Sequence, residues 1–194
     1  MTLATPKTFT LEEYHHLIEI GFFDRNDRIE LIRGELIKIA AKGTAHSVCE
    51  MRLERALYSL IGNRATLRGQ QPITLPNNSE PEPDRAIVRN RDDDYLNGHP
   101  TPEDILLVIE VSDRTLNFER TVKMPLYAEA KIGNYWIFNL VDRILECYSE
   151  PYQNDGDRYS YRTTRIFLPN ESVTLPEFSD LLLDLSTVFL PPKL

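Results

Sequence analysis

Blocks of hydrophobic and polar positions predict helices and strands along most of the chain. Residues 44–62 place apolar side chains on one face at helical spacing, with a threonine at the start and a glycine at the end. Residues 10–21 predict a shorter helix that begins with a capping-box pattern. Residues 28–40 are rich in β-forming side chains around Arg33-Gly34, which predicts a hairpin that turns there.

The middle of the chain predicts three strands, a helix and two further strands. The strands cover residues 65–75, with Gly69 as a candidate break, 84–88 and 104–111. The helix covers 118–131, and a hairpin of residues 134–140 and 143–149 follows. The polar segment with Asp92, Asp93 and Asp94 predicts a solvated loop. Residues 175–190 predict a strand entry and a short terminal helix. This order suits a mixed sheet with helices on both faces, so we expect an α/β (mixed α+β) protein with one domain over residues 1–194.

Composition limits the classes of function. The 194 residues, 41% hydrophobic and 27% charged, suit a globular domain. No run approaches the ~18 apolar residues of a membrane span, and no signal-peptide pattern is present, so we expect a cytoplasmic protein without a membrane partner. Cys49 and Cys147 lack metal-type spacing and are expected to be reduced. The net charge of -8 argues against strong non-specific DNA binding, but it does not exclude a local cleft that binds nucleic acid.

Two acidic residues stand among apolar strand residues, Asp84 at the start of one strand and Glu110 near the end of the next. Side chains alternate along a strand, so Glu110 is expected to share a face with Leu106, Val108 and Ser112. If the two strands are neighbours, the carboxylates converge, and a divalent cation would relieve their repulsion. Such oxygen ligands favour Mg²⁺ or Mn²⁺. The alternative is that both acids are solvated residues at strand ends.

An ordered set of motifs resembles a known family. Its members are "PD" at 83–84, "EVS" at 110–112, Lys123, Tyr127 and "NYW" at 134–136, with "IELIRGEL" at 29–36 and His46 at the start of the first long helix. Together they resemble the bacterial putative restriction endonuclease domain family of the PD-(D/E)XK nuclease superfamily, from about residue 8 to 190. The resemblance implies a restriction-endonuclease-like core and a metal-dependent phosphodiesterase.

The resemblance also implies roles for particular residues. Asp84 and Glu110 would bind the metal. The superfamily usually carries a lysine two residues after the acid, where this chain has Ser112. In this family the lysine lies on the following helix, and Lys123 matches it. Lys123 and Tyr127 are four residues apart and so share a helix face. Judged without the resemblance, Lys123 is more simply a surface lysine.

Three features bear on how Lys123 is oriented. Pro125 lies inside the predicted helix, where it should kink the helix or delay its start. The family often has a glutamate before "YW", where this chain has Asn134. An aspartate common four residues before the lysine is Glu119 here.

Two further residues are candidates for the site. Glu30 matches the family's recurrent glutamate in the hairpin, which would bind the metal or orient a water molecule. The opposing interpretation is an exposed strand residue. Glu35 is the alternative to Glu30 for the functional role. His46 either lines the cleft beside the metal or is a core histidine with a satisfied hydrogen bond.

These residues predict a Mg²⁺- or Mn²⁺-dependent endonuclease that hydrolyses phosphodiester bonds in DNA. The alternative is an interaction or regulatory module, expected to be a homodimer, that keeps the nuclease fold with a weak or absent active site. The acidic balance, Ser112 and Pro125 favour that alternative. A hydrolase of RNA or of a smaller phosphodiester is a third interpretation, because the same chemistry serves it.

Overall fold

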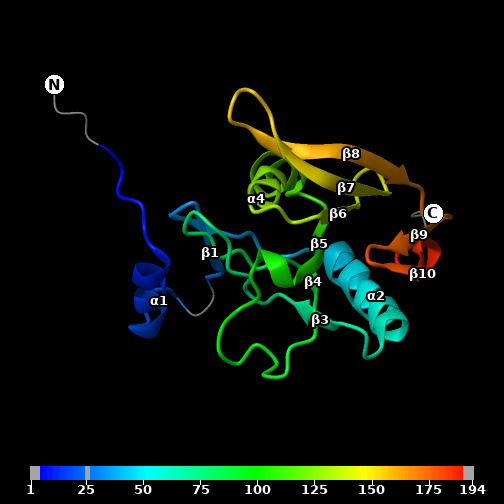
Figure 1. Ribbon diagram of the computed structural model, residues 1–194, viewed down its shortest axis with the longest axis horizontal. Coiled ribbons are helices and arrows are strands. Elements are labelled where there is room, and N and C mark those ends of the chain that lie inside the picture. Colours follow the sequence, from blue (N-terminus) through cyan, green and yellow to red (C-terminus); the bar gives the residue numbers. More distant parts are fainter. Residues whose placement is uncertain (1–4, 25–26, 190–194) are drawn as a thin grey trace.

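A six-stranded mixed sheet lies at the centre of the structure, a computed structural model that describes residues 5–24 and 27–189 (Figure 1). In order across the sheet, its strands are β3 (Thr66–Gly69), β4 (Arg85–Val88), β5 (Ile105–Ser112), β6 (Asn134–Asn139), β7 (Ile144–Gln153) and β8 (Tyr159–Phe167). β5 and β6 are parallel, and the other neighbouring pairs are antiparallel. The predicted mixed sheet is therefore confirmed.

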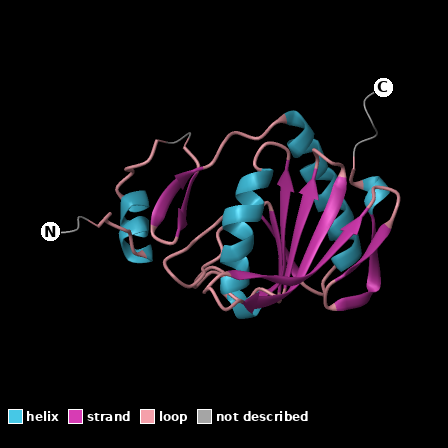
Figure 2. Ribbon diagram, turned by 90° about the horizontal axis from the view of Figure 1, so that it is seen from above, coloured by secondary structure: helices cyan, strands magenta, loops and turns pink. Residues whose placement is uncertain are grey.

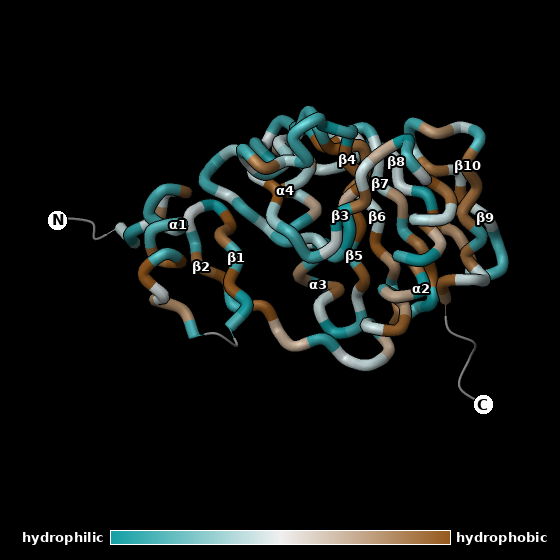
Figure 3. Tube along the Cα trace, turned by 90° about the horizontal axis from the view of Figure 1, so that it is seen from below, coloured by the Kyte–Doolittle hydropathy of each residue, from teal (hydrophilic) through white to brown (hydrophobic). Residues whose placement is uncertain are grey.

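Helices cover both faces of this sheet (Figure 2). One face is covered by α2 (Thr44–Ile61), and the other by a helical segment made of α3 (Leu116–Phe118), the π-helical turn η2 (Glu119–Lys123) and α4 (Met124–Glu129). Successive strand residues point to opposite faces, so Trp136 of β6 packs with α2 and Tyr135 packs with α4. Figure 3 shows the hydrophobic segments gathered in the central strands.

A small N-terminal unit lies beside the sheet (Figure 1). It consists of α1 (Leu11–Glu19) and a hairpin of β1 (Ile29–Ile32) and β2 (Glu35–Lys38). The predicted capping box at Thr10 is confirmed. Arg33 and Gly34 form the predicted turn with φ values of 51° and 78°, as a two-residue hairpin loop of this kind requires. A bridge between Leu31 and Glu80 ties β1 to the segment that leads into β4, which holds the hairpin close to one end of the sheet.

The C-terminal part corrects two expectations. The predicted short helix within residues 175–190 is wrong over the described positions, because β9 (Ser172–Leu175) and β10 (Phe178–Asp184) form a hairpin there. Up to residue 189, the last described one, a single 3-10 turn, η3 (Leu185–Thr187), follows, and the Asp184 side chain accepts a hydrogen bond from the Ser186 N–H at its start. Strand β8 was not predicted, since several of its side chains are exposed and its pattern carries little hydrophobic signal.

The strands β3 and β5 also differ from their predicted form. β3 ends at Gly69 rather than at residue 75, because Gln70 adopts a positive φ of 52° and the chain leaves the sheet.

In β5 the pairing with β4 shifts register, so that Ile87 lies opposite Leu107 but Val88 lies opposite Ile105. The extra residue in the bulge reverses the alternation. Leu106 therefore packs on the α2 side, and its predicted position on the face of Glu110 is wrong.

No helix among the described residues is both long and apolar enough to cross a membrane. Cys49 is buried in the core beneath α2, and Cys147 is partly buried in β7; both are free thiols, as expected. Burial raises the pKa of the Cys49 thiol to about 12, so this thiol stays protonated near neutral pH.

Leu53 tests how far the packing of α2 stabilises the fold. Its side chain is fully buried against the sheet. We expect Leu53→Ala to lower the free energy of unfolding by about 2–5 kcal/mol, because the substitution leaves a cavity in the core. Met51 lies on the exposed side of the same helix, so Met51→Ala is the control and should change stability by less than about 0.5 kcal/mol. Urea unfolding of both variants makes the comparison, and equal losses would contradict the assigned packing.

Candidate active site

The backbones of β4 and β5 hold Asp84 and Glu110 together. Asp84 directly precedes β4, and the antiparallel pairing places Arg85 opposite Ile109. The Asp84 N–H donates to Glu110 Oε2 at 3.1 Å, and the Val111 N–H donates to Asp84 Oδ2 at 2.8 Å. Both side chains are buried. The alternative that these acids are solvated residues at strand ends is therefore wrong.

The π-helical turn places Lys123 beneath the same carboxylates. Lys123 Nζ donates to Glu110 Oε1 at 2.9 Å, and the Tyr127 hydroxyl donates to the same oxygen at 3.0 Å. Lys123 is only 3% exposed, so its interpretation as a surface lysine is wrong. Pro125 follows the wider turn, in which Met124 N–H donates to the carbonyl of Glu119, five residues back. The chain thus accommodates the proline with a π turn, a feature that often marks functional positions in helices.

Glu30 approaches the site from the N-terminal hairpin. It lies on β1 with a side chain that is 1% exposed, so the alternative of an exposed strand residue is wrong. Its carboxylate oxygens lie 3.3 and 3.4 Å from Lys123 Nζ. Glu35, the alternative for this role, is exposed on β2. The ammonium group of Lys123 therefore bridges two acids, one from the sheet and one from the hairpin.

The first turns of α2 add two more groups. His46 Nε2 lies 3.3 Å from the Asp84 carboxylate, so the ring faces the site and is also buried. Glu50 follows one helical turn later, and its Oε2 lies 3.7 Å from His46 Nε2. Ligand atoms of His46, Glu50 and Asp84 all lie within 4.8 Å of one another. Glu50 was missed in the sequence, although its spacing of four residues from His46 places the two on one helix face.

The donor set suits a divalent ion. A nitrogen and carboxylate oxygens from separate elements converge at one point, and buried acids of this kind are costly without a cation. Three neighbouring side chains already partner the acids. Lys42 Nζ lies 2.6 Å from Asp84 Oδ1, and the Arg85 guanidinium and the Gln70 amide donate to Glu50 Oε1 at 2.6 and 2.7 Å. No motif in the sequence indicated Lys42, Gln70 or Arg85.

Burial and neighbouring charges shift the pKa values of this cluster. Burial, together with the nearby Asp84 and Glu30, raises the pKa of Glu110 to about 7 despite the opposing charge of Lys123. Burial also opposes the charge of Asp84, but His46 and Lys42 outweigh it and lower the pKa of Asp84 below its usual range. Burial opposes the charge of Lys123 as well, yet the carboxylates of Glu110 and Glu30 hold its pKa well above the ordinary value. The negative charge of Asp84 is thus held more firmly than that of Glu110.

Glu119 lies behind the site, in the π-helical turn. It is buried, and the Tyr135 hydroxyl donates to its Oε2 at 3.4 Å. Burial and the nearby Glu110 raise the pKa of Glu119 to about 8. Asn134 points elsewhere, since its side-chain amide donates to the Leu106 carbonyl at 3.2 Å. Ser112 is buried, and its hydroxyl lies 3.1 Å from that of Thr115, so it does not contact the carboxylates in the way a lysine at this position would.

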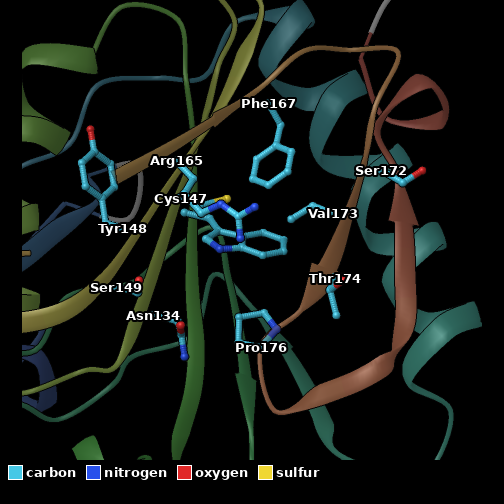
Figure 4. A pocket seen from close by; sticks show the side chains of 11 residues that line it. Asn134, Cys147, Tyr148, Ser149, Arg165, Phe167, Ser172, Val173, Thr174 and Pro176 are labelled. Carbon is cyan, nitrogen blue, oxygen red and sulfur yellow. The ribbon is translucent and has the colours of Figure 1, made fainter. Parts of the chain in front are cut away.

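A small cavity of about 100 Å³ opens onto these groups. Charged side chains dominate its lining, which consists of Arg28, Glu30, Ile39, Ala40, Ala41, Lys42, His46, Glu82, Asp84, Glu110, Val111, Asp113, Arg114, Thr115, Glu119 and Lys123. A second cavity lies between the sheet and the β9–β10 hairpin (Figure 4). Figure 4 shows Arg165 and Phe167 on one side of it and Val173 and Pro176 on the other. None of the residues that line this second cavity carries a carboxylate, so the acidic chemistry belongs to the first.

Glu119 makes stability depend on pH. Its pKa is raised from 4.5 to about 8 in the folded protein, so the unfolded chain loses this proton first as the pH rises. The contribution to stability is complete below about pH 4.5 and is lost as the pH approaches 8. We expect Glu119→Gln to reduce the loss of unfolding free energy between pH 5 and pH 8 by about 1 kcal/mol or more. Urea unfolding in EDTA at both pH values measures the unfolding free energy, with Glu12→Gln at an exposed position as the control. A pH dependence in Glu119→Gln equal to that of the wild type would contradict the raised pKa of Glu119.

Comparisons with known proteins identify the family and support the fold. The model of the family named Uma2, described as "Putative restriction endonuclease", matches residues 11–186. The solved structure titled "Crystal structure of a putative nuclease belonging to DUF820 from Anabaena variabilis" matches with a TM-score of 0.68 at 16% identity, over 95% of this chain and 98% of that one. At this identity the likeness shows the fold. No curated protein matches the sequence significantly. The family match over most of its length shows that the chain belongs to the Uma2 putative restriction endonuclease family.

Proposed function

We propose that this protein is a metal-dependent endonuclease that hydrolyses phosphodiester bonds in DNA. The observation that carries the proposal is the convergence of Asp84, Glu110 and Lys123, from two strands and a helix, at one cavity. Family membership supports a nucleic-acid substrate, since a restriction endonuclease acts on DNA. The acids, the lysine and the cavity form the minimum set that phosphodiester hydrolysis needs.

Asp84 is the central metal ligand in this proposal. Its neighbours His46 and Lys42 lower its pKa and favour its charged form, and it contacts both Glu110 and the α2 side of the site. His46 and Glu50 would complete the ligand set from α2, with Glu110 on the other side of Asp84. Carboxylates suit Mg²⁺ and Mn²⁺, and the imidazole favours Mn²⁺ of the two. When bound, such an ion polarises the phosphate and makes a bound water more acidic.

Lys123 supplies the positive charge that the reaction needs near the phosphate. Its raised pKa keeps the ammonium group charged at neutral pH, and Glu110 and Tyr127 fix the position of that group. A fixed, desolvated cation stabilises negative charge that develops in the transition state. Ser112 stands where most members of the superfamily carry their lysine. In this proposal Lys123 takes over that lysine's role, because the π-helical turn directs it to the Glu110 carboxylate.

The rim of the cavity suits a phosphate backbone. Arg28 and Arg114 line it, and both side chains are in reach of solvent. Arg28 pairs with Glu82, so the exposed Arg114 is the guanidinium group that would meet an approaching polyanion. A homodimer, which would offer one site to each DNA strand, remains a prediction that sedimentation of the pure protein can check.

Cleavage of plasmid DNA tests the proposal directly. In MnCl₂ or MgCl₂ we expect wild-type protein to convert supercoiled plasmid to nicked or linear forms. Asp84→Asn, Glu110→Gln and Lys123→Met should each reduce the rate about 100-fold or more, because each removes several kcal/mol of transition-state stabilisation. Glu103→Gln is the matched control for Glu110→Gln, since Glu103 is exposed and lies outside the cavity. It should retain the wild-type rate.

The same experiment separates the competing interpretations. Thermal unfolding monitored by circular dichroism should show that every variant is folded, so that a lost activity reports on chemistry. Cleavage that survives both Asp84→Asn and Glu110→Gln would refute the assigned site. Wild-type protein that cleaves neither DNA nor RNA with either ion would favour an interaction module that keeps the nuclease fold. Cleavage of RNA alone would retain the chemistry and change the substrate.

A further inference from the structure

Lys42 has no role in the reaction as described so far, yet it lies at the centre of the acidic cluster. It belongs to the segment between β2 and α2, and its side chain is 17% exposed. Its Nζ lies 2.6 Å from Asp84 Oδ1 and 3.2 Å from Glu50 Oε2. Asp84 and Glu50 are two of the three residues that could hold a divalent ion. The ammonium group therefore contacts two of the carboxylates that the ion would use.

The Lys42 ammonium group and the divalent ion would compete for the same carboxylate lone pairs. Asp84 Oδ2 accepts from the Val111 N–H, which occupies one of its lone pairs, whereas Oδ1 accepts from Lys42 and faces no backbone N–H. Glu50 is in the same position, because its Oε1 accepts from Arg85 and Gln70 and its Oε2 faces Lys42. An ammonium group is a compact charge with three donors, and it fills such a position much as a small ion does.

Lys123 differs from Lys42 in this respect. Its Nζ contacts Glu110 and Glu30, which lie on the other side of Asp84. It is held in a helix, whereas Lys42 is carried by a segment that contains Ala40, Ala41 and Gly43 outside the helices and strands. Lys42 and its neighbours also line the cavity, so an ammonium group displaced from Asp84 stays at the mouth of the site.

We propose that Lys42 is a tethered cation that occupies the position of the divalent ion, so that the ion binds by displacing its ammonium group from Asp84 and Glu50. The inference rests on the proposed metal-dependent function. It means that the metal-free site is already neutralised by the chain itself. The competition weakens ion binding, and Lys42 thereby sets the ion concentration at which the site fills.

Calorimetric titration of the full chain with MnCl₂, at one pH and ionic strength, tests this competition. Lys42→Met removes the competing charge and should tighten Mn²⁺ binding about ten-fold or more, because a unit charge within a few ångströms of the ion is lost. Lys42→Gln keeps a hydrogen-bond donor for Asp84 while removing the charge, so it should fold as the wild type does and show the same tightening.

A matched control separates direct competition from the general electrostatic effect of removing one positive charge from the cavity. Arg28 lines the same cavity, but it pairs with Glu82 rather than with Asp84 or Glu50. Arg28→Met removes the same charge from the cavity and should tighten binding by less than about three-fold. Equal tightening in the Lys42 and Arg28 variants would overturn the proposal, as would Mn²⁺ affinity in both Lys42 variants equal to or weaker than that of the wild type.

Asp84→Asn distinguishes this inference from the proposed function. One outcome is that the wild-type protein binds Mn²⁺, that Asp84→Asn does not, and that the Lys42 variants have the wild-type affinity. In that case the metal site stands and only the competition is refuted. If neither the wild type nor any Lys42 variant binds Mn²⁺ at millimolar concentration, the metal site itself is refuted, and the competition with it.

Discussion

The reciprocal backbone hydrogen bonds between Asp84 and Glu110 are the constraint on which the site depends. The Glu110 carboxylate accepts from the Asp84 N–H at 3.1 Å. The Asp84 carboxylate accepts from the N–H of Val111, the residue after Glu110, at 2.8 Å. This arrangement fixes two acids in the interior of the protein, where uncompensated charge is costly. The surrounding elements then supply partners, with Lys123 and Tyr127 from the helical segment, and Lys42 and His46 from the start of α2 and the segment before it.

The peripheral elements can be understood as supports for that centre. The N-terminal hairpin is too small to form a core of its own, but its pairing with Glu80 brings Glu30 within contact of Lys123. The π-helical turn allows Pro125 to lie two residues after Lys123 without loss of the helix. Both features were visible in the sequence as a hairpin and as a misplaced proline. The sequence made Glu30 and Lys123 candidates for the site, but only the tertiary structure shows their contacts, because these join residues 93 and 13 positions apart.

Positive and negative groups in the site nearly balance without any bound ion. Lys42, Arg85 and Lys123 face Glu30, Glu50, Asp84 and Glu110, and burial favours the protonated form of Glu110 by raising its pKa to about 7. The low overall pI therefore says little about the site, because the electrostatics that matter act over a few ångströms.

The sequence by itself determined the mixed sheet, the covering helices and the candidacy of Asp84, Glu110 and Lys123, because hydrophobic periodicity and ordered motifs are local properties. It failed for β8 and for the C-terminal hairpin, where exposed strands carry weak patterns, and for Leu106, where a bulge in the pairing with β4 reversed the alternation. Glu50, Gln70, Arg85 and Lys42 were decided only by the tertiary structure. They enter the site through the packing of α2 and its preceding segment against the ends of β3 and β4, and no single stretch of sequence records which side chains will meet there.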